Sequence, residues 1–324
     1  MKTRSFLITI GLLTCLPSLF TCSKDEGLNM DKETGLFYVN CNDVNFPDDI
    51  HVFLIGLDGW GGFSMPKADM PNVKSLMSNG AYTFKKRSVF PTSSGPNWAS
   101  LFMGVSVEQH GYNNWNSTVP AFPSQYVGPN GICPTIFTIL RGQKPESKTG
   151  YFYEWEGMKY YADIEAISKY AHFPLYKQEP NHDVITNEFC NYILQDRPQF
   201  CAIIYDEPDY TGHQKGFNSD AYYNECCTMD GYVGKIIQVI RDSGLLENSI
   251  IIVTSDHGGI NKSHGGTTLE EMESPFIISG TRVKPLGEFT YSMMQYDVAA
   301  IIAYIFKLRK PQSWIGQNCK WLFE

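Results

Sequence analysis

The sequence lacks the features on which several large classes of protein depend. Its 26 Lys and Arg residues are outnumbered by 34 Asp and Glu residues, so the formal net charge is −8. Proteins that grip long nucleic acids make many phosphate contacts through basic side chains, and no nucleic acid polymer is therefore expected as a partner. The nine cysteines include no Cys-x-x-Cys pair, which argues against a cysteine zinc site. Internal repeats and low-complexity tracts are absent as well.

Apolar runs long enough for a confident membrane span are also missing. The run 6–20 is short, but it follows a basic start and precedes polar residues, which is the order of a secretory signal. Residues 19–22 (LFTC) resemble a lipoprotein box. We therefore expect residues 1–21 to be a signal peptide and Cys22 to be a lipidated N-terminus that anchors the protein to a membrane; ordinary cleavage is the alternative. The acidic start 23–26 resembles that of surface lipoproteins, which predicts an exported protein in the periplasm or at the outer membrane or cell surface of a Gram-negative bacterium.

Cysteine usage fits export without defining a disulfide framework. Two of the nine cysteines, Cys15 and Cys22, belong to the leader, and nine minus two leaves seven. Export permits disulfides, but an odd number leaves at least one thiol unpaired. Cys201 lies inside an apolar run, where we expect it to fill the core.

What the sequence does contain is three apolar, β-branched runs that each lead into acidic residues. They are 50–57 (IHVFLIGL), 200–205 (FCAIIY) and 249–255 (SIIIVTS). Continuous apolar runs of this length are typical of strands buried on both faces, as in a parallel sheet covered by helices.

Helical patterns lie between these runs. Apolar residues at helical spacing predict one helix over 70–79, with Gly80 as its stop, and a longer helix over 220–243 that ends at Gly244. Alternation of strands and helices predicts an α/β fold with a mostly parallel central sheet and helices on both faces.

The domain organisation follows from length and composition. A chain of 324 residues with 43% hydrophobic residues is long enough for one large α/β domain. We expect residues 22–48, which are polar and irregular, to be a tether, and residues 49–324 to form a single catalytic domain. The segment 142–198 is rich in Tyr and carries no readable motif, which makes it a candidate for a small cap or insertion that shapes the pocket.

Acidic residues fall where an open α/β sheet binds its ligands, beyond the carboxyl ends of the strands. Asp58 directly follows the first run. After the second run, Asp209 and His213 are four residues apart, so a single helical turn would place both on one face. A carboxylate and an imidazole on one face suit a zinc-like ion. Each Asp taken singly is equally well explained as a turn former or a helix cap.

The third run leads into two further candidate ligands and a returning loop. Asp256 and His257 are adjacent, and His264 follows seven residues after His257 in a glycine-rich loop that would bring it back to the same place. Only seven histidines occur in the chain, and three fall in these two short segments. The other four lack a convincing carboxylate partner and are expected to be structural or surface residues: His51, His110, His172 and His182.

Together these residues supply enough oxygen and nitrogen for two metal ions that share a site. A metal pair can ionise a serine hydroxyl and hold the attacking and leaving oxygens of an in-line displacement. The stretch 90–110 offers three hydroxyls before an apolar, helix-like segment, Thr92, Ser93 and Ser94. Any of them would also serve as an ordinary N-cap.

The order of these motifs resembles that of the alkaline phosphatase superfamily, and within it the type I phosphodiesterase/nucleotide pyrophosphatase branch. The resemblance rests on a set of motifs that span most of the mature chain: Asp58, Ser94-Gly95-Pro96-Asn97, Met103-Gly104 to His110-Gly111, Glu207-Pro208-Asp209 with Gly212-His213, Ser255-Asp256-His257-Gly258, and His264-Gly265. In that branch the nucleophile stands two residues before a Pro-Asn pair, which selects Ser94. An alkaline-phosphatase-like fold is implied.

The resemblance also implies how two divalent metal ions would be held, and zinc is the expected ion. One set of ligands is Asp209, His213 and His264, and the other is Asp58, Asp256, His257 and the oxygen of Ser94. The family binds a phosphoryl oxygen with an Asn after the nucleophile stretch. Counting places this residue at Asn114, with Asn113 and Asn116 as neighbouring alternatives.

The implied function is metal-dependent hydrolysis of a small phosphate ester such as a nucleotide, by a phosphodiesterase or nucleotide pyrophosphatase that forms a covalent phospho-Ser94 intermediate. Serine is more typical of monoesterase relatives, so a phosphomonoesterase, or a phosphotransferase with a lipid or sugar acceptor, is the alternative. A non-catalytic, metal-stabilised surface lipoprotein is a remote third. Sulfatase relatives have Arg where this chain has Trp98, which disfavours sulfate hydrolysis.

Overall fold

The computed structural model describes residues 29–30, 37–39, 45–174 and 182–324. The signal peptide and Cys22 lie outside these residues, as does Cys41. Within the described ranges, no helix has the length and apolar character needed to cross a membrane. The six described cysteines, Cys201 among them, are all free thiols.

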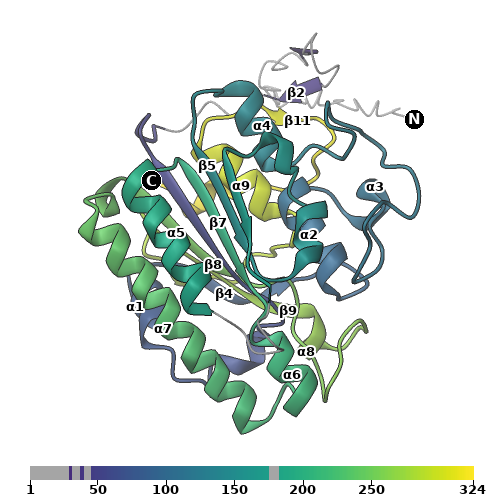
Figure 1. Cartoon of the computed structure of the whole chain (residues 1–324), viewed down its shortest axis with the longest axis vertical. Coiled ribbons are helices and arrows are strands. Elements are labelled where there is room, and N and C mark those ends of the chain that lie inside the picture. Colours follow the sequence, from purple (N-terminus) through teal and green to yellow (C-terminus); the bar gives the residue numbers. More distant parts are fainter. Residues whose placement is uncertain (1–28, 31–36, 40–44, 175–181) are drawn as a thin grey trace, which may run out of the picture.

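A mixed sheet of eight strands forms the centre of the molecule (Figure 1). Its spatial order is β10-β4-β9-β8-β3-β7-β5-β6. Every neighbouring pair is parallel except the two that involve β9, which runs antiparallel to both β8 and β4. The strands are β3 His51–Leu57, β4 Gly80–Arg87, β5 Thr149–Tyr153, β6 Lys169–His172, β7 Phe200–Tyr205, β8 Ser249–Thr254, β9 Glu273–Gly280 and β10 Gly287–Glu288.

The three apolar runs of the sequence are the adjacent parallel strands β8, β3 and β7, and their carboxyl ends are level. Leu57 pairs with Tyr205, and Gly56 pairs with Thr254. The residues that follow these strands therefore emerge at the same edge of the sheet. This register brings segments about 150 to 200 positions apart in the chain to one place, which is the requirement for a shared site.

Helices cover both faces of the sheet, and the apolar residues of β3 divide between them. Val52 and Leu54 belong to one hydrophobic cluster, whereas Phe53, Ile55 and Leu57 belong to the other. This alternation follows from the two-residue period of a strand. The first face is covered by α2 Ser94–Met103, α4 Ile136–Gln143 and α9 Asp297–Ile305, and the second by α1 Pro71–Ser78, α5 His182–Asp196 and α7 Asp220–Asp242.

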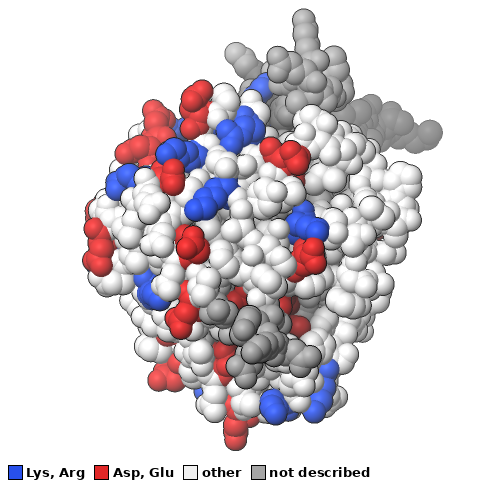
Figure 2. All heavy atoms as spheres, in the orientation of Figure 1, with Lys and Arg blue, Asp and Glu red and all other residues white. Residues whose placement is uncertain are grey.

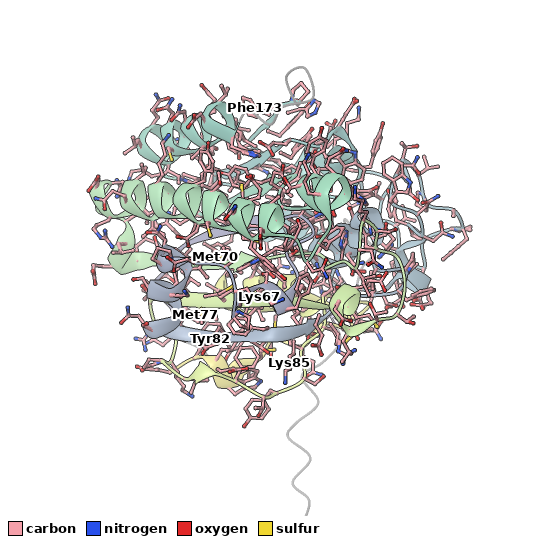
Figure 3. All side chains as sticks on the ribbon, turned by 90° about the horizontal axis from the view of Figure 1, so that it is seen from below. Lys67, Met70, Met77, Tyr82, Lys85 and Phe173 are labelled. Carbon is pink, nitrogen blue, oxygen red and sulfur yellow. The ribbon has the colours of Figure 1, made fainter. Side chains whose placement is uncertain are left out.

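The helices that cover the second face of the sheet can be followed in the figures. Figure 1 shows α5 and α7 side by side, and the two helices are in contact. Figure 3, viewed from below, places Met70 and Met77 of the α1 segment near Tyr82 of β4, with Phe173 at the opposite side of the molecule. Figure 2 shows acidic and basic side chains interspersed over the visible surface.

The ends of the predicted helices differ in how closely they follow the sequence signals. For α7, the Ser219 hydroxyl accepts a hydrogen bond from the Tyr222 amide at the start, and Gly244 has a φ of +70° just beyond the end. Helix α1 ends at Ser78, but Gly80 is already the first residue of β4. A Cβ at that position would lie 2.1 Å from the Ile278 carbonyl oxygen, so Gly80 permits close strand packing.

Two segments are more ordered in the fold than the sequence indicates. The segment 142–198, expected as a cap or insertion, supplies β5 and β6 to the central sheet and α5 to its face. Within the predicted tether, β1 (Asn29–Met30) and β2 (Phe37–Val39) form a small antiparallel sheet with β11 (Lys310–Pro311). The remaining short elements are α3 Val107–His110, α6 Asp209–Lys215, α8 Leu269–Met272 and 3-10 turns at Gly62–Ser64, Glu156–Tyr160, Ile164–Ala166, Leu246–Asn248 and Lys320–Leu322.

Candidate active site

Ser94 is the first residue of α2 and lies against two of the predicted metal ligands. Its Oγ is 3.3 Å from Asp58 Oδ1 and 3.2 Å from His257 Nε2. The side chain is only 8% exposed. A hydroxyl at a helix N-terminus faces unpaired backbone N–H groups, which favour its oxyanion. The structure thus places one of the three hydroxyls next to both a carboxylate and an imidazole.

The Pro-Asn pair explains how the loop before α2 is held. The Asn97 side chain is buried, and its Nδ2 donates to the carbonyl oxygens of Val89, Pro91 and Ser93. Its Oδ1 accepts from the Val89 amide at 2.7 Å. A single amide group therefore secures the segment that leads to Ser94, and a substitution at Asn97 would leave several buried backbone groups unsatisfied.

Thr92 has a different role from Ser94. Its Oγ1 donates to the Gly266 carbonyl at 2.8 Å and accepts from the Gly265 amide at 3.1 Å. Its own carbonyl oxygen is 2.9 Å from His264 Nδ1. Thr92 therefore ties the returning loop to the nucleophile loop.

The first cluster of candidate metal ligands comprises Asp58, Asp256 and His257, all buried. His257 Nε2 lies 3.2 Å from Asp256 Oδ2 and 3.6 Å from Asp58 Oδ1. Asp58 Oδ2 accepts a hydrogen bond from Trp98 Nε1 at 2.8 Å. A ligand atom from each member lies within 4.8 Å of the others, which is close enough for one cation to reach all three.

The backbone approaches this cluster closely at Gly59, just after β3. The Gly59 amide donates to Asp256 Oδ1 at 3.0 Å. Gly59 has a φ of +64°, and a Cβ there would lie 2.5 Å from Asp209 Oδ1. Glycine is therefore required at this turn by both its conformation and its proximity to two carboxylates.

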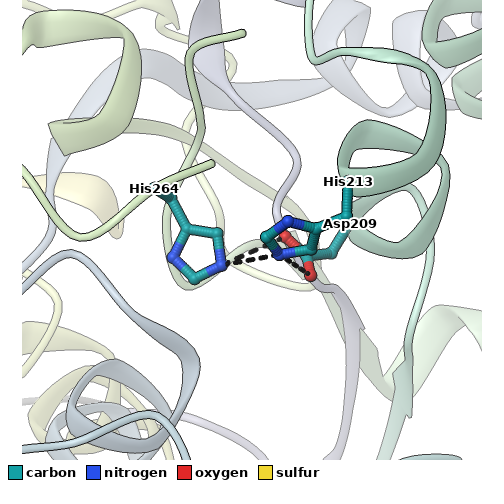
Figure 4. A group of neighbouring side chains, drawn as sticks. All are labelled: Asp209, His213 and His264. Atoms are coloured by element: carbon teal, nitrogen blue, oxygen red, sulfur yellow. Dashed lines mark hydrogen bonds and ion pairs between the residues drawn. The ribbon is translucent and has the colours of Figure 1, made fainter. Parts of the chain in front are cut away.

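The second cluster comprises Asp209, His213 and His264 and is shown in Figure 4. Asp209 and His213 lie on one face of α6, as their four-residue spacing predicts, with Oδ2 and Nε2 3.2 Å apart. His264 Nε2 is 3.7 Å from Asp209 Oδ1 and 3.0 Å from His213 Nε2. The His257 and His264 rings stack with centroids 3.9 Å apart, so the two clusters are neighbours.

The hydrogen bonds of the three histidines show which nitrogen faces each cluster. The Nδ1 atoms of His213, His257 and His264 lie 2.8 to 2.9 Å from backbone carbonyl oxygens of Lys262, Gly258 and Thr92, respectively. A carbonyl can only accept, so each Nδ1 carries a proton, and each ring in its neutral form turns an Nε2 lone pair inward. Two lone pairs 3.0 Å apart in the second cluster are best satisfied by a cation, and this orientation is typical of metal-ligating histidines.

Unpaired carboxylate oxygens support the same conclusion. Asp209 Oδ1 and Asp256 Oδ2 are buried and have no hydrogen-bond partner. A buried carboxylate oxygen without a partner is costly unless a cation neutralises it. The donor set of the two clusters therefore fits divalent metal ions, and its mixture of imidazole and carboxylate is one that zinc accepts.

Burial and neighbouring charges shift the pKa values of these site residues. Burial, together with the carboxylates of Asp256 and Asp209, raises the pKa of Asp58 well above its usual range. Burial raises the pKa of Asp256 to about 7 and lowers the pKa of His264 to about 4. The hydrogen bond with Asp209 raises the pKa of His213 to about 9. A metal ion would displace the protons that Asp58 and Asp256 otherwise retain in the first cluster and that His213 otherwise retains in the second.

A pocket of about 480 Å³ opens over the clusters and Ser94. Its lining includes residues that sequence reasoning missed, namely Asp206, Tyr210, Ser263 and Trp155. Asp206 had a usable signal, because it follows β7 as Asp58 follows β3. Trp155 had none; it stacks on Trp115 with ring centroids 6.1 Å apart, and the contact joins segments far apart in the chain.

Asn114 remains a prediction. It is exposed, its Oδ1 accepts from the Trp115 amide at 2.8 Å, and it is not among the residues that line the pocket. Its backbone nevertheless lies close to the nucleophile, since a Cβ on Gly95 would be 2.4 Å from the Asn114 carbonyl oxygen. Asn113 and Asn116 are exposed as well.

One expectation about the remaining histidines is wrong. His182 does have a carboxylate partner, because its Nδ1 lies 2.6 Å from Glu154 Oε1 in a buried pair. The partners are 28 positions apart and come from α5 and the end of β5, so local sequence does not reveal them. His51 and His110 are buried and bond to Pro198 and Ser100, as structural histidines do.

Comparison with known proteins places this chain in a family. Residues 52–276 match the family model of type I phosphodiesterase/nucleotide pyrophosphatase. This match covers more than half of the chain. The chain belongs to the type I phosphodiesterase/nucleotide pyrophosphatase family. The matched region of this family member contains every residue predicted for the site, from Asp58 to His264.

Related sequences and structures agree with this membership. Mouse ectonucleotide pyrophosphatase/phosphodiesterase family member 7 is 26% identical over 259 residues, 76% of this chain and 56% of the relative. Human bis(5'-adenosyl)-triphosphatase ENPP4 is 24% identical over 219 residues, 64% of this chain and 47% of the relative. The chain spans about half the length of these two relatives and about a quarter of the length of human ectonucleotide pyrophosphatase/phosphodiesterase family member 1.

Solved structures show that the family member shares its fold with a phosphodiesterase and with a sulfatase. An inactive form of murine ectonucleotide pyrophosphatase/phosphodiesterase 5 in complex with AMP superposes with a TM-score of 0.69, at 16% identity, covering 85% of this chain and 100% of that structure. A 2-O GAG sulfatase gives a TM-score of 0.67 at 14% identity, covering 84% of this chain and 74% of that one. Identities this low show a common alkaline-phosphatase-like fold alone.

Proposed function

We propose that this family member hydrolyses phosphodiester or pyrophosphate bonds of nucleotide-like substrates, with two divalent cations and a covalent phospho-Ser94 intermediate. The observation that carries the proposal is the convergence of two three-residue ligand clusters beside one serine hydroxyl. Three carboxylates, Asp58, Asp209 and Asp256, bring a charge of about −3, which two divalent cations more than neutralise. When bound, the cations would supply the positive charge that favours a serine oxyanion and the transition state of phosphoryl transfer.

The residues of the chain prepare Ser94 for attack. The hydroxyl is held within hydrogen-bonding distance of Asp58 and His257 at the first turn of α2, whose N–H groups favour a negative oxygen. Trp98 Nε1 fixes Asp58 by donating to its other carboxylate oxygen. The Ser94 hydroxyl would give up its proton as its Oγ bonds to phosphorus and the bond to the leaving oxygen breaks, and the leaving oxygen would take up a proton in exchange. Water would then cleave the phosphoserine bond, so two in-line displacements predict retention of configuration at phosphorus.

The pocket favours a substrate with a flat group. Trp115 is 54% exposed and stacks with Trp155 at an interplanar angle of 27°, so the pair presents an aromatic wall to the pocket. Aromatic side chains of this kind stack on nucleobases without selecting among them. The name of the human relative, bis(5'-adenosyl)-triphosphatase, and the AMP complex of the murine structure support a nucleotide as the substrate.

The nucleophile is tested by comparing two neighbouring hydroxyls. Ser94→Ala should abolish turnover while the metal content of the protein stays the same, because three side-chain ligands remain in each cluster. Ser93→Ala is the matched control and should retain hydrolysis. Rates on bis-p-nitrophenyl phosphate and metal analysis of each purified variant make the measurement. Undiminished hydrolysis by Ser94→Ala would overturn the assignment.

The type of ester is tested on the same protein. A phosphodiesterase should hydrolyse bis-p-nitrophenyl phosphate faster than p-nitrophenyl phosphate, and a large excess for the monoester would favour a phosphomonoesterase instead. Adding a sugar or lipid alcohol as acceptor and analysing the products would reveal a phosphotransferase, since the phosphoryl group would then reach the acceptor rather than water. A protein that neither binds zinc nor turns over either ester would favour the surface-binding alternative.

We also propose that the protein is exported and anchored through a lipid at Cys22. The basis is the basic start, the apolar run 6–20 and the LFTC junction of the sequence. Metabolic labelling with a radioactive fatty acid should label the full-length protein but not a Cys22→Ser variant. Equal labelling of both would contradict the anchor.

A further inference from the structure

A third group of candidate ligating side chains, two of them buried, lies apart from the active-site pocket. It comprises His182 at the start of α5, Glu207 after β7, and Glu225 on α7, with one ligand atom from each within 4.8 Å of the others. His182 and Glu207 are 6% and 2% exposed. None of the three lines the pocket over Ser94. The group is therefore distinct from the two clusters of the proposed catalytic site.

The hydrogen bond of His182 determines which of its nitrogens is free. Nδ1 lies 2.6 Å from Glu154 Oε1, and a proton on Nδ1 would be donated to that carboxylate. The Nε2 atom is buried and has no hydrogen-bond partner. Metal-ligating histidines commonly donate one ring N–H to a carboxylate and bind the ion through the other nitrogen. The carboxylate orients the ring and makes it more basic. Glu154 is already used in this way, and its Oε2 accepts from the Asp206 amide at 2.8 Å.

The two carboxylates complete a donor set that a metal ion would accept. Glu207 accepts from the Thr211 amide at 2.9 Å and from the Thr211 hydroxyl at 3.0 Å, which holds its carboxylate in place. Each of its oxygens retains a further lone pair. Glu225 is half-buried and approaches from the neighbouring helix. One imidazole and two carboxylates, with room for water, suit a divalent ion of the zinc class.

We propose that His182, Glu207 and Glu225 bind a third divalent cation of the zinc class, with Glu154 as the residue that positions His182. This ion would join α5, α7 and the β7–α6 corner. Glu207 is two residues before Asp209, and its bonds to Thr211 lie within the first turn of α6. The ion would thus stabilise the helix that carries Asp209 and His213 without taking part in the reaction. The inference does not depend on the catalytic role proposed for Ser94.

The test is a difference in zinc stoichiometry. The full chain and its variants are saturated with Zn²⁺, passed over a desalting column, and measured for zinc and protein. Glu225→Gln changes a half-buried residue with little change in volume and should bind one Zn²⁺ fewer per chain than the wild type. Glu247→Gln is the matched control: the residue is exposed, lies at the opposite end of the sheet before β8, and should bind as many ions as the wild type.

A second variant guards against a folding defect in the first. Glu207→Gln should also lose one Zn²⁺, and in both variants the increase in Tm on adding Zn²⁺ should be smaller than in the wild type. Equal zinc counts in the wild type, Glu225→Gln and Glu207→Gln would overturn the third site. If the catalytic ions were absent instead, the total would fall in every protein but the difference of one ion would persist, so the two proposals fail in distinguishable ways.

Discussion

The buried imidazole of His110 makes a prediction about how stability depends on pH. His110 ends α3 and is fully buried. The Tyr112 amide donates to its Nδ1 at 3.0 Å, so the ring proton is on Nε2, which donates to the Ser100 hydroxyl at 2.9 Å. Burial lowers the pKa of His110 to about 3. A second proton on the ring would have to displace the Tyr112 amide in a fully buried site.

The sign and size of the effect follow from proton linkage. In the unfolded chain the pKa of a histidine is about 6.5, so between that pH and pH 3 the unfolded state binds a proton that the folded state does not. The free energy of unfolding should therefore fall with decreasing pH by about 1.4 kcal/mol per pH unit below pH 6.5, or about 2 kcal/mol at pH 5. Full stability from this group is present above pH 6.5.

A non-titrating variant isolates this contribution from the other groups that titrate in acid. His110→Gln should be less stable than the wild type at pH 7 by about 1 to 3 kcal/mol, because a buried hydrogen bond and some packing are lost. Its disadvantage should shrink as the pH falls and vanish between about pH 4.5 and pH 6, since glutamine has no proton to gain. Urea denaturation followed by tryptophan fluorescence, at half-unit pH steps, measures the difference directly.

Ser100→Ala is the matched control. It removes the hydroxyl that accepts from Nε2 but keeps the imidazole, so it should lower stability at neutral pH and retain the dependence on pH. A difference between wild type and His110→Gln that stays constant from pH 7 to pH 4.5 would refute the reasoning, because it would mean that the ring titrates equally in both states.

Three further predictions concern the site. Gly95→Ala should lower kcat/KM by about 10²-fold with unchanged zinc content. The added Cβ would lie 2.4 Å from the Asn114 carbonyl oxygen and 2.7 Å from Tyr161 Oη, so it would displace Ser94. Near-normal kinetics of this variant would contradict the prediction. Trp155→Ala should raise KM for a nucleotide diester roughly 5- to 10-fold with little change in kcat, through the lost stacking platform beside Trp115, whereas a fall in kcat alone would point to another role. Dialysis against a chelator should abolish hydrolysis and added Zn²⁺ should restore it, and activity that survives complete metal removal would exclude the metal-dependent proposal.

The elements that build the site could be predicted from the sequence almost to the residue. The predicted runs 200–205 and 220–243 correspond to β7 and α7, whose bounds are Phe200–Tyr205 and Asp220–Asp242. Continuous apolar residues and helical spacing are local properties; β7 is buried along its whole length, and α7 buries the apolar residues of one face. Asp and His residues that follow such strands are then predicted to lie close together, because the carboxyl ends of parallel strands lie at one edge of the sheet.

Contacts between distant segments could not be predicted in this way. The segment 142–198 has no long apolar run, yet Tyr151 and Phe152 of β5 are fully buried between layers of the core. Short strands with aromatic residues are hard to distinguish from loops when their partners are unknown. Strand β5 ends at Tyr153 and so places the next two residues, Glu154 and Trp155. The contacts Glu154–His182 and Trp115–Trp155 therefore cannot be predicted unless this strand is recognised. Sequence reasoning therefore identified candidate ligands, which the fold brings together, and missed Trp155 in the pocket wall.

The level ends of β8, β3 and β7 have a consequence for the order of events during folding. The Gly59 amide and the Asp256 carboxylate that it contacts are separated by 197 positions, so neither cluster exists until the parallel strands have found their partners. Pairing of strands so far apart in the sequence is slow, because the entropy of closing the loop is lost before the contacts between the strands can stabilise it. A metal ion that binds both segments at once would be captured only by chains whose strands are in register, and it would then slow their unfolding. Metal binding would thus follow the assembly of the sheet and would select the chains in which the strands are correctly paired.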